Sequence, residues 1–170
     1  SCSPSTPQGM AIDFDLFRAA MGQMASGVTV VTVRAGAEDH GFTASSFTSL
    51  SLDPMLVLVC VVRDTRSHLL IEQAGHYAVN ILSHRQKRLG MRFADALLED
   101  RFAGLALDRA STGAPILPDS LAWVDCALRA VLPGGDHSIF VGEVLAGSAT
   151  LSNDALVYYN RQWGRFVTDE

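Results

Sequence analysis

Hydrophobic residues occur along this chain mainly in short β-branched runs, with a few stretches at helical spacing between them. The runs predict strands at residues 28–33, 55–62, 77–82, 121–132, 138–146, 156–159 and 163–167. Residues 55–62 are apolar at every position, which predicts a central strand buried on both faces.

Helical spacing appears in four places. Phe17, Ala20, Met21 and Met24 form one apolar stripe, which Asp13 or Asp15 can cap and Gly27 can end. Residues 63–73 become helical with Leu69 and Leu70 facing inward, residues 86–93 resemble a helix, and weak helix is expected within 95–120.

The order of these elements favours a mainly β fold, a small barrel with peripheral helices. Strands follow one another both through tight turns, such as residues 133–136, and through helices. No GxGxxG motif follows a strand, which argues against a doubly wound parallel sheet. We expect a flexible tail at residues 1–12, without the blocks of a signal peptide, and a single domain over residues 13–170.

Composition narrows the functional classes. The chain is 48% hydrophobic, which is typical of a sizeable core and hints at apolar surface buried in a partner subunit. The formal net charge of −5 gives no global attraction to nucleic acid or anionic membranes, and no apolar stretch is long enough for a transmembrane helix.

The cysteines and histidines indicate neither disulfides nor metal. Cys2, Cys60 and Cys126 are far apart, and no CxxC or metal-spaced histidine pair is present. Cys60 and Cys126 lie in apolar runs and are expected in the core. This usage fits a reducing compartment, so we expect a metal-free, cytoplasmic protein.

Residues 41–46 form an unusual stretch of small and hydroxyl-bearing residues between two apolar strands. Such a run lets a flat ligand approach the backbone and offers N–H and O–H donors to ring heteroatoms. The alternative is an ordinary edge strand rich in hydroxyls.

Residues 63–68 follow the most apolar strand and open a helix. A cation, hydroxyls and free helix N–H groups together suit a phosphate, and Arg92 could add a second charge. The alternative is a solvated helix start in which Asp64 or Thr65 is only the cap.

Two further places carry candidate chemistry. His137 stands at the entrance of a strand after a Gly-Gly-Asp turn, although a histidine there is often only a turn residue. Residues 158–161 and Trp163 could form an aromatic and cationic wall for a nucleotide, or could simply cover the core.

Taken together, residues 25–32, 40–54, 91–94, 100–104, 135–137 and 141–144 carry a resemblance to a known family. From about Phe14 to Phe166 the sequence resembles the short-chain flavin reductases, whose fold is the FMN-binding split barrel, a Greek-key barrel that forms a homodimer. Met55 departs from the family, which usually has a second proline after Asp53-Pro54.

The resemblance implies roles for particular residues. Flavin ring and ribityl contacts would come from Thr43, Ala44, Ser45, Ser46, Cys60 and Val61, and the remaining flavin contacts, mainly to phosphate, from Arg63, Thr65, Ser67, Arg92 and Phe93. The nicotinamide nucleotide would meet His137, as a positioning residue, together with Tyr158, Tyr159, Asn160 and Arg161.

The resemblance also implies an activity. It is reduction of FMN or FAD by NADH or NADPH, with hydride passing directly from the nicotinamide to flavin N5. The reduced flavin would supply a separate monooxygenase by diffusion. The alternatives are a split-barrel sensor or carrier that binds flavin without turnover, and a β-barrel interaction domain. The preferred flavin and nicotinamide, the strength of flavin binding, and the oxygenase with its substrate stay open.

Overall fold

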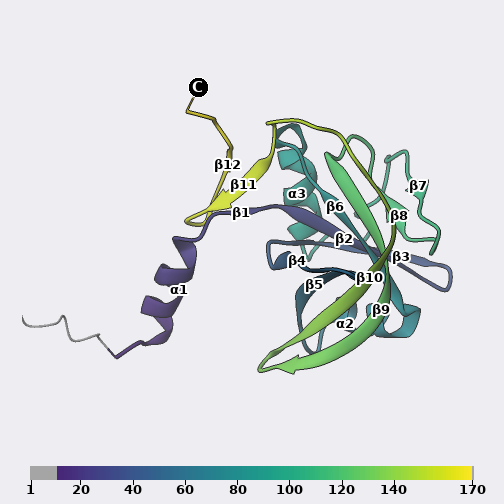
Figure 1. Cartoon of the computed structure of the whole chain (residues 1–170), viewed down its shortest axis with the longest axis horizontal. Helices are drawn as coiled ribbons and strands as arrows, with labels where there is room; N and C mark the ends of the chain where they lie inside the picture. Colours follow the sequence, from purple (N-terminus) through teal and green to yellow (C-terminus); the bar gives the residue numbers. More distant parts are fainter. Residues whose placement is uncertain (1–10, 170) are drawn as a thin grey trace, which may run out of the picture.

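The computed structural model describes residues 11–169, so Cys2 and most of the expected tail lie outside the described residues. The chain is mainly β, as the sequence predicts (Figure 1). The helices are α1 (Phe14–Gly22), α2 (Arg66–Ala74), the 3-10 turn η1 (His84–Gln86) and α3 (Lys87–Ala94). The strands are β1 (Ser26–Gly27), β2 (Thr29–Ala35), β3 (Glu38–Ala44), β4 (Phe47–Leu52), β5 (Met55–Val62), β6 (His76–Ile81), β7 (Asp108–Arg109), β8 (Pro115–Ile116), β9 (Ala122–Gly134), β10 (His137–Ala149), β11 (Leu156–Tyr159) and β12 (Gln162–Arg165).

Seven strands form the main sheet, in the order β3-β2-β6-β9-β10-β5-β4. Its two edge strands, β3 and β4, follow each other in the chain with only Ser45 and Ser46 between them. A two-residue link can span only about 10 Å, so the two edges of the sheet must lie close together and the sheet must curl into a barrel. Ser45 and Ser46 therefore lie at the seam of the barrel.

The barrel interior is filled by aliphatic and aromatic side chains from opposite strands. Val59, Tyr77 and Phe140 are completely buried there, and the Tyr77 hydroxyl donates to the Phe140 carbonyl oxygen at 2.9 Å. A second apolar cluster lies outside the barrel wall, where Val30 of β2 packs with Phe93 of α3 and Leu156 of β11. The hairpin β11–β12 and α3 thus cover one side of the barrel.

The expectation that residues 55–62 are buried on both faces is wrong. In β5 the residues alternate, with Val57, Val59 and Val61 buried inside and Leu58 and Cys60 only half-buried outside. The strand buried on both faces is β2, because α3 and the β11–β12 hairpin cover its outer face. Cys126 is a core residue as predicted, whereas Cys60 is not.

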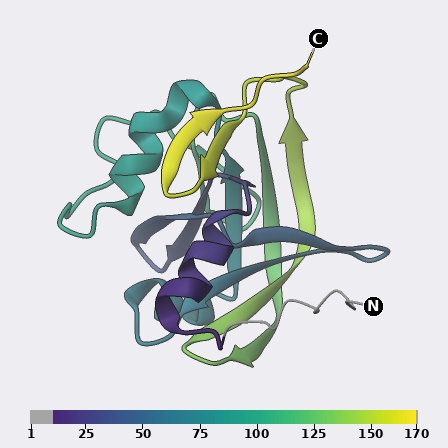
Figure 2. The ribbon, with the colours of Figure 1, turned by 90° about the vertical axis from the view of Figure 1, so that its left-hand side faces the viewer.

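Several helix predictions also need correction. Helix α1 is capped by the Asp13 side chain but ends at Gly22, because the chain then enters β1, where Gly27 pairs with Val157. In α2, Leu70 is buried but Leu69 is 51% exposed, and residues 95–120 contain turns and the short strands β7 and β8 instead of helix. Helix α1 has no buried residue and stands beside the barrel, below the β11–β12 hairpin (Figure 2).

Candidate functional site

The seam of the barrel is held in place by hydroxyl groups of the motif at residues 43–46. The Thr43 hydroxyl donates to the Gly90 carbonyl oxygen of α3 at 2.6 Å, and the Ser46 hydroxyl donates to the Cys60 carbonyl oxygen at 2.8 Å. The Ala44 carbonyl oxygen accepts from the Thr29 hydroxyl at 2.8 Å. Because β3 and β4 are the edge strands of the described sheet, their outer edges can offer backbone N–H and C=O groups to a ligand, apart from the Gly41 carbonyl oxygen, which accepts from Arg101.

A pocket of about 300 Å³ opens at this seam. It is lined by Val28, Thr43, Ala44, Ser45, Tyr158, Arg161 and Trp163. The structure therefore brings together two segments that the sequence singled out separately, the small-residue motif and the aromatic C-terminal segment. A flat ring stacked here would meet backbone on one side and aromatic side chains on the other.

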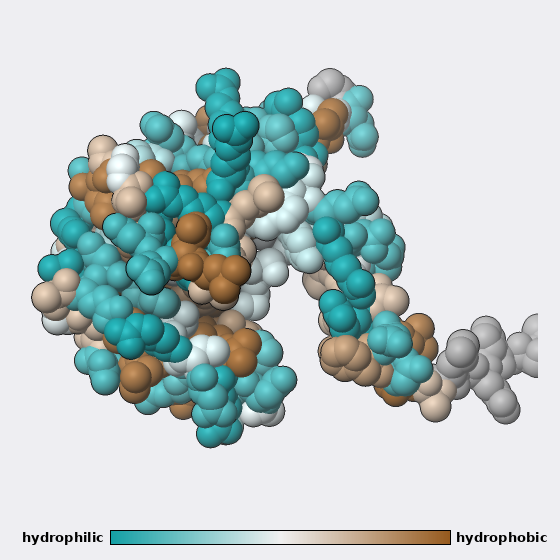
Figure 3. Space-filling model, turned by 180° about the vertical axis from the view of Figure 1, so that it is seen from behind, coloured by the Kyte–Doolittle hydropathy of each residue, from teal (hydrophilic) through white to brown (hydrophobic). Residues whose placement is uncertain are grey.

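The pocket continues into a second cleft of about 460 Å³ between the barrel and α1. Ser45, Tyr158 and Arg161 line both spaces, and α1 adds Phe17 and Met21. The space-filling view shows this cleft between the helix and the body of the molecule (Figure 3).

The hairpin β11–β12 gives the pocket its cationic wall. Its two-residue turn places Asn160 and Arg161 in the left-handed region, with φ of 48° and 61°. Asparagine adopts this conformation readily, whereas arginine does so at a cost, so the strained residue lies at the candidate site. Tyr158 packs edge-on against Trp163, and the Tyr159 hydroxyl donates instead to Gln23 Oε1 at 2.9 Å.

A second group of predicted residues gathers where β5 ends. His137 pairs with Val62 across the sheet, and the Arg63 N–H donates to the Asp136 carbonyl oxygen at 2.9 Å. His137 Nδ1 lies 2.7 Å from Asp136 Oδ1, and this hydrogen bond lowers the pKa of the Asp136 carboxyl. The structure thus brings His137 and Arg63 together.

The hydroxyls predicted to bind phosphate already have partners inside the protein. Thr65 caps α2, accepting from the His68 N–H and donating to the Val62 carbonyl oxygen at 2.7 Å. The Ser67 hydroxyl lies 2.7 Å from His40 Nε2. What this segment offers an anion is the exposed Arg63 guanidinium and the N–H groups of Arg66 and Ser67, which open α2 and have no acceptor within the helix.

The two groups are linked by β5. The Ser46 hydroxyl donates a hydrogen bond to the Cys60 carbonyl oxygen. Arg63 follows Cys60 by three residues, which is about 10 Å of extended chain. A ligand with its ring at the seam could therefore extend along the end of β5 toward Arg63.

Three predicted residues are placed differently. Arg92 donates to the Ala103 carbonyl oxygen at 2.6 Å. Phe93 is completely buried, edge-on against Phe102, and Val61 is buried in the barrel, so neither side chain is open to a ligand here. Their contact with a cofactor stays a prediction. The sequence reading missed Val28, whose only signal was its place at the start of a strand.

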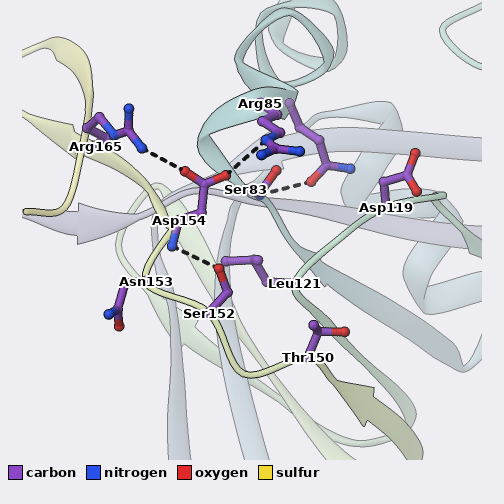
Figure 4. A pocket seen from close by; sticks show the side chains of 10 residues that line it. Ser83, Arg85, Asp119, Leu121, Thr150, Ser152, Asn153, Asp154 and Arg165 are labelled. Carbon is purple, nitrogen blue, oxygen red and sulfur yellow. Dashed lines mark hydrogen bonds and ion pairs between the residues drawn. The ribbon is translucent and has the colours of Figure 1, made fainter.

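A larger cleft of about 830 Å³ lies elsewhere and contains none of the predicted site residues (Figure 4). Asp154 pairs there with both Arg85 and Arg165, and Asp119 also lines the cleft, so the two acids balance the two arginines. Within residues 11–169, no group of three or more His, Cys, Asp or Glu side chains is arranged to hold a metal ion.

Comparison with known proteins identifies the family. Residues 21–166 match the model described as "Flavin reductase like domain", and the chain belongs to this family. It is 39% identical over 160 residues to the flavin-dependent monooxygenase reductase subunit HsaB of Rhodococcus jostii, covering 94% of this chain and 82% of that protein. It is also 39% identical over 158 residues to a flavin reductase of Pseudomonas putida, covering 92% of each.

The fold agrees with this assignment. The solved structure of the Streptomyces globisporus NADH:FAD oxidoreductase in complex with NAD and FAD fragments superposes with a TM-score of 0.87 at 34% identity, covering 95% of this chain and 99% of that one. The expected flavin reductase split barrel is thereby confirmed. Two Rhizobium meliloti relatives, a probable flavin reductase and a stachydrine N-demethylase reductase subunit, are longer, and the matched region covers 42% and 56% of their lengths. Among the described helices, none is long and apolar enough to span a membrane.

Proposed function

We propose that this protein is an NAD(P)H:flavin oxidoreductase that reduces FMN or FAD and supplies the reduced flavin to a separate monooxygenase. The observation that carries the proposal is the pocket at the barrel seam, where the Thr43–Ser46 motif meets Tyr158 and Trp163. Family membership and the names of the relatives, which include flavin reductases and monooxygenase reductase subunits, support it.

The seam holds the flavin ring in this proposal. Ser45 and the free edges of β3 and β4 face the ring heteroatoms, while Tyr158 and Trp163 cover the ring. Arg63 and the N–H groups that open α2 receive the phosphate, since a helix N-terminus and a cation both favour an anion. Thr65 and Ser67 then act mainly by holding this segment in shape.

When bound, the flavin accepts a hydride at N5 directly from the nicotinamide. The protein needs no nucleophile for this step, and its task is to hold two rings in contact and to limit water. His137, half-exposed next to Val62, positions the nicotinamide, and Arg161 offers a cation to its phosphates.

The test is oxidation of NADH or NADPH by the purified protein, followed by the loss of nicotinamide absorbance with and without added FMN or FAD. Oxidation that depends on added flavin is the expected result, and the same assay names the preferred flavin and nicotinamide. Flavin binding without oxidation of either nicotinamide would contradict the proposed activity and favour a non-catalytic flavin sensor or carrier. Absence of any flavin binding would favour an interaction domain.

A homodimer is part of the proposal. Helix α1 exposes Phe14 to 71% and Met21 to 54%, and the outer face of β5 leaves Leu56, Leu58 and Cys60 half-covered. A second copy would cover both surfaces, since exposed apolar patches of this kind mark interfaces. A monomeric mass in light scattering at micromolar concentration would contradict it. A cytoplasmic location likewise stays a prediction.

Delivery to a monooxygenase by diffusion requires that reduced flavin leaves the site. The seam pocket opens into the cleft beside α1 and is not enclosed by the described residues, which suits exchange. A micromolar dissociation constant corresponds to about −8 kcal/mol and would allow release.

A further inference from the structure

His68 of α2 is held at both ring nitrogens. Its Nε2 lies 2.8 Å from the Ser138 hydroxyl of β10, and its Nδ1 lies 2.8 Å from Glu72 Oε1. The ring also packs edge-on against Phe140, with the centroids 4.8 Å apart. The His68 side chain is only 15% exposed, and Ser138 is buried.

The Ser138 end of this contact is rigid. Strand β10 pairs with β5 on one side and with β9 on the other, and Ser138 has a partner in each. A strand held by two ladders does not depend on one side-chain contact for its position. The His68–Ser138 bond therefore fixes the helix to the strand, and its loss would act on α2.

The first turn of α2 is held to the sheet by polar contacts. The buried apolar residues of the helix, Leu70 and Ile71, come after this turn. Before them, Ser67 bonds to His40, Arg66 pairs with Glu38, and His68 bonds to Ser138. The position of this turn sets where the Arg63 to Ser67 segment presents its cation and N–H groups.

We infer that His68 is a positioning residue for the flavin phosphate, which ties the start of α2 to the rigid strand β10 through Ser138. The inference rests on the proposed function, because it takes the Arg63 to Ser67 segment as the phosphate-binding element. It assigns His68 no contact with flavin or nicotinamide.

The first variant is His68→Leu, which keeps an apolar side chain against Phe140 and removes both hydrogen bonds. We expect the flavin dissociation constant, measured by fluorescence quenching, to rise about tenfold, a change equivalent to about 1.4 kcal/mol. A change of this size is typical of one hydrogen bond. The KM for the nicotinamide and the kcat at saturating flavin should stay within about twofold, because His68 contacts neither the nicotinamide nor the flavin ring. His68→Gln, whose amide can reach the position of Nε2, should restore flavin binding.

A double variant separates positioning from stability. His68→Leu alone leaves the buried Ser138 hydroxyl without its partner and should lower the Tm. His68→Leu with Ser138→Ala removes both polar groups, so the Tm should recover while flavin binding stays weak. His84→Gln, at a half-buried histidine outside the site, is the matched control and should change nothing.

Two outcomes would overturn the inference. One is unchanged flavin binding in folded His68→Leu, and the other is flavin binding that recovers together with the Tm in the double variant. Both leave the proposed function intact as long as the unsubstituted protein reduces flavin. Failure of the unsubstituted protein to reduce flavin would instead contradict the proposed function.

Discussion

Gly90 of α3 lies directly against the indole of Trp163. A Cβ atom at Gly90 would be 2.8 Å from Trp163 Cζ3, closer than such contacts allow, and 3.3 Å from Leu82 Cδ1, which is tight. The carbonyl oxygen of the same glycine accepts from the Thr43 hydroxyl. One residue of α3 thus supports both walls of the seam pocket, the aromatic wall and the small-residue motif.

Gly90→Ala should therefore damage the pocket. Alanine is the better helix former by about 1 kcal/mol, but overpacking against Trp163 and Leu82 costs about 1–3 kcal/mol. We expect the indole to be displaced and the flavin dissociation constant to rise about fivefold, as measured by fluorescence titration. Gly27→Ala is the control, because a Cβ there meets nothing within 4 Å. Equal flavin dissociation constants for the two variants would show that Trp163 does not contribute to flavin binding.

Arg161→Gly should weaken ligand binding without lowering the stability of the fold. Arg161 has φ of 61°, which costs a non-glycine residue about 1–2 kcal/mol, so glycine should leave the free energy of unfolding unchanged or raise it by about 1 kcal/mol. Loss of the cation should raise the KM for flavin or nicotinamide several-fold. Urea unfolding and steady-state kinetics measure the two effects. Arg161→Lys, with the charge kept and the same backbone, should bind nearly normally, and kinetics of Arg161→Gly identical to wild type would exclude Arg161.

His137→Ala should affect the nicotinamide and spare the flavin. His137 lies at the end of the β9–β10 hairpin and is bonded to Asp136. We expect a several-fold rise in the nicotinamide KM or a fall in kcat, with the flavin dissociation constant unchanged. Stopped-flow reduction of the bound flavin separates nicotinamide binding from hydride transfer. Unchanged kinetics would show that His137 has no role in nicotinamide binding and serves only in the turn.

His40 should make the stability depend on pH. Burial lowers the pKa of His40 below its ordinary value of 6.5, and the nearby Arg101 and Arg66 add to this, against the opposite effect of Glu38. A lowered pKa means that the folded state favours the neutral ring, so the unfolded chain binds more protons below pH 6.5. The contribution of neutral His40 to the free energy of unfolding should be fully present above pH 6.5, and it should be lost as the pH falls below 6.5 toward the pKa of the folded state.

The measurement is the difference in urea stability about one pH unit above and about one unit below the ordinary histidine pKa. Wild type should lose more stability on acidification than His40→Gln, whose amide can still bond to Ser67. An equal loss in the two proteins would show that other groups cause the pH dependence.

Local pattern predicted most of the secondary structure correctly. The β-branched runs became β2, β5, β6 and β9–β12, and the Thr65 cap and the Gly135 turn are where such residues are expected. These features depend on neighbours in the chain, and side-chain shape and capping chemistry are sufficient to set them. The stretch of small and hydroxyl-bearing residues at 41–46 also stands out in the sequence, because hydroxyls between two apolar strands are unusual.

The local sequence pattern does not predict which faces of the strands are buried. Residues 55–62 are apolar throughout, yet one face of β5 is left half-covered, while the outer face of β2 is covered by α3 and by the β11–β12 hairpin, which come much later in the chain. Helix α1 ends before Gly27 for the same reason, since Gly27 pairs with Val157 in β1. Long-range pairing decides such cases, and one sequence does not reveal it.

The sequence by itself therefore determined the mainly β class, the turns, the caps and the chemical character of the candidate residues. Only the tertiary structure decided that Thr43 to Ser46 form the seam where the two edges of the barrel meet, that Tyr158 and Arg161 lie there, and that the hydroxyls of Thr65 and Ser67 are used internally. The physical reason is that propensity and capping act over a few residues, whereas a site is made where the closing of a sheet brings distant segments together.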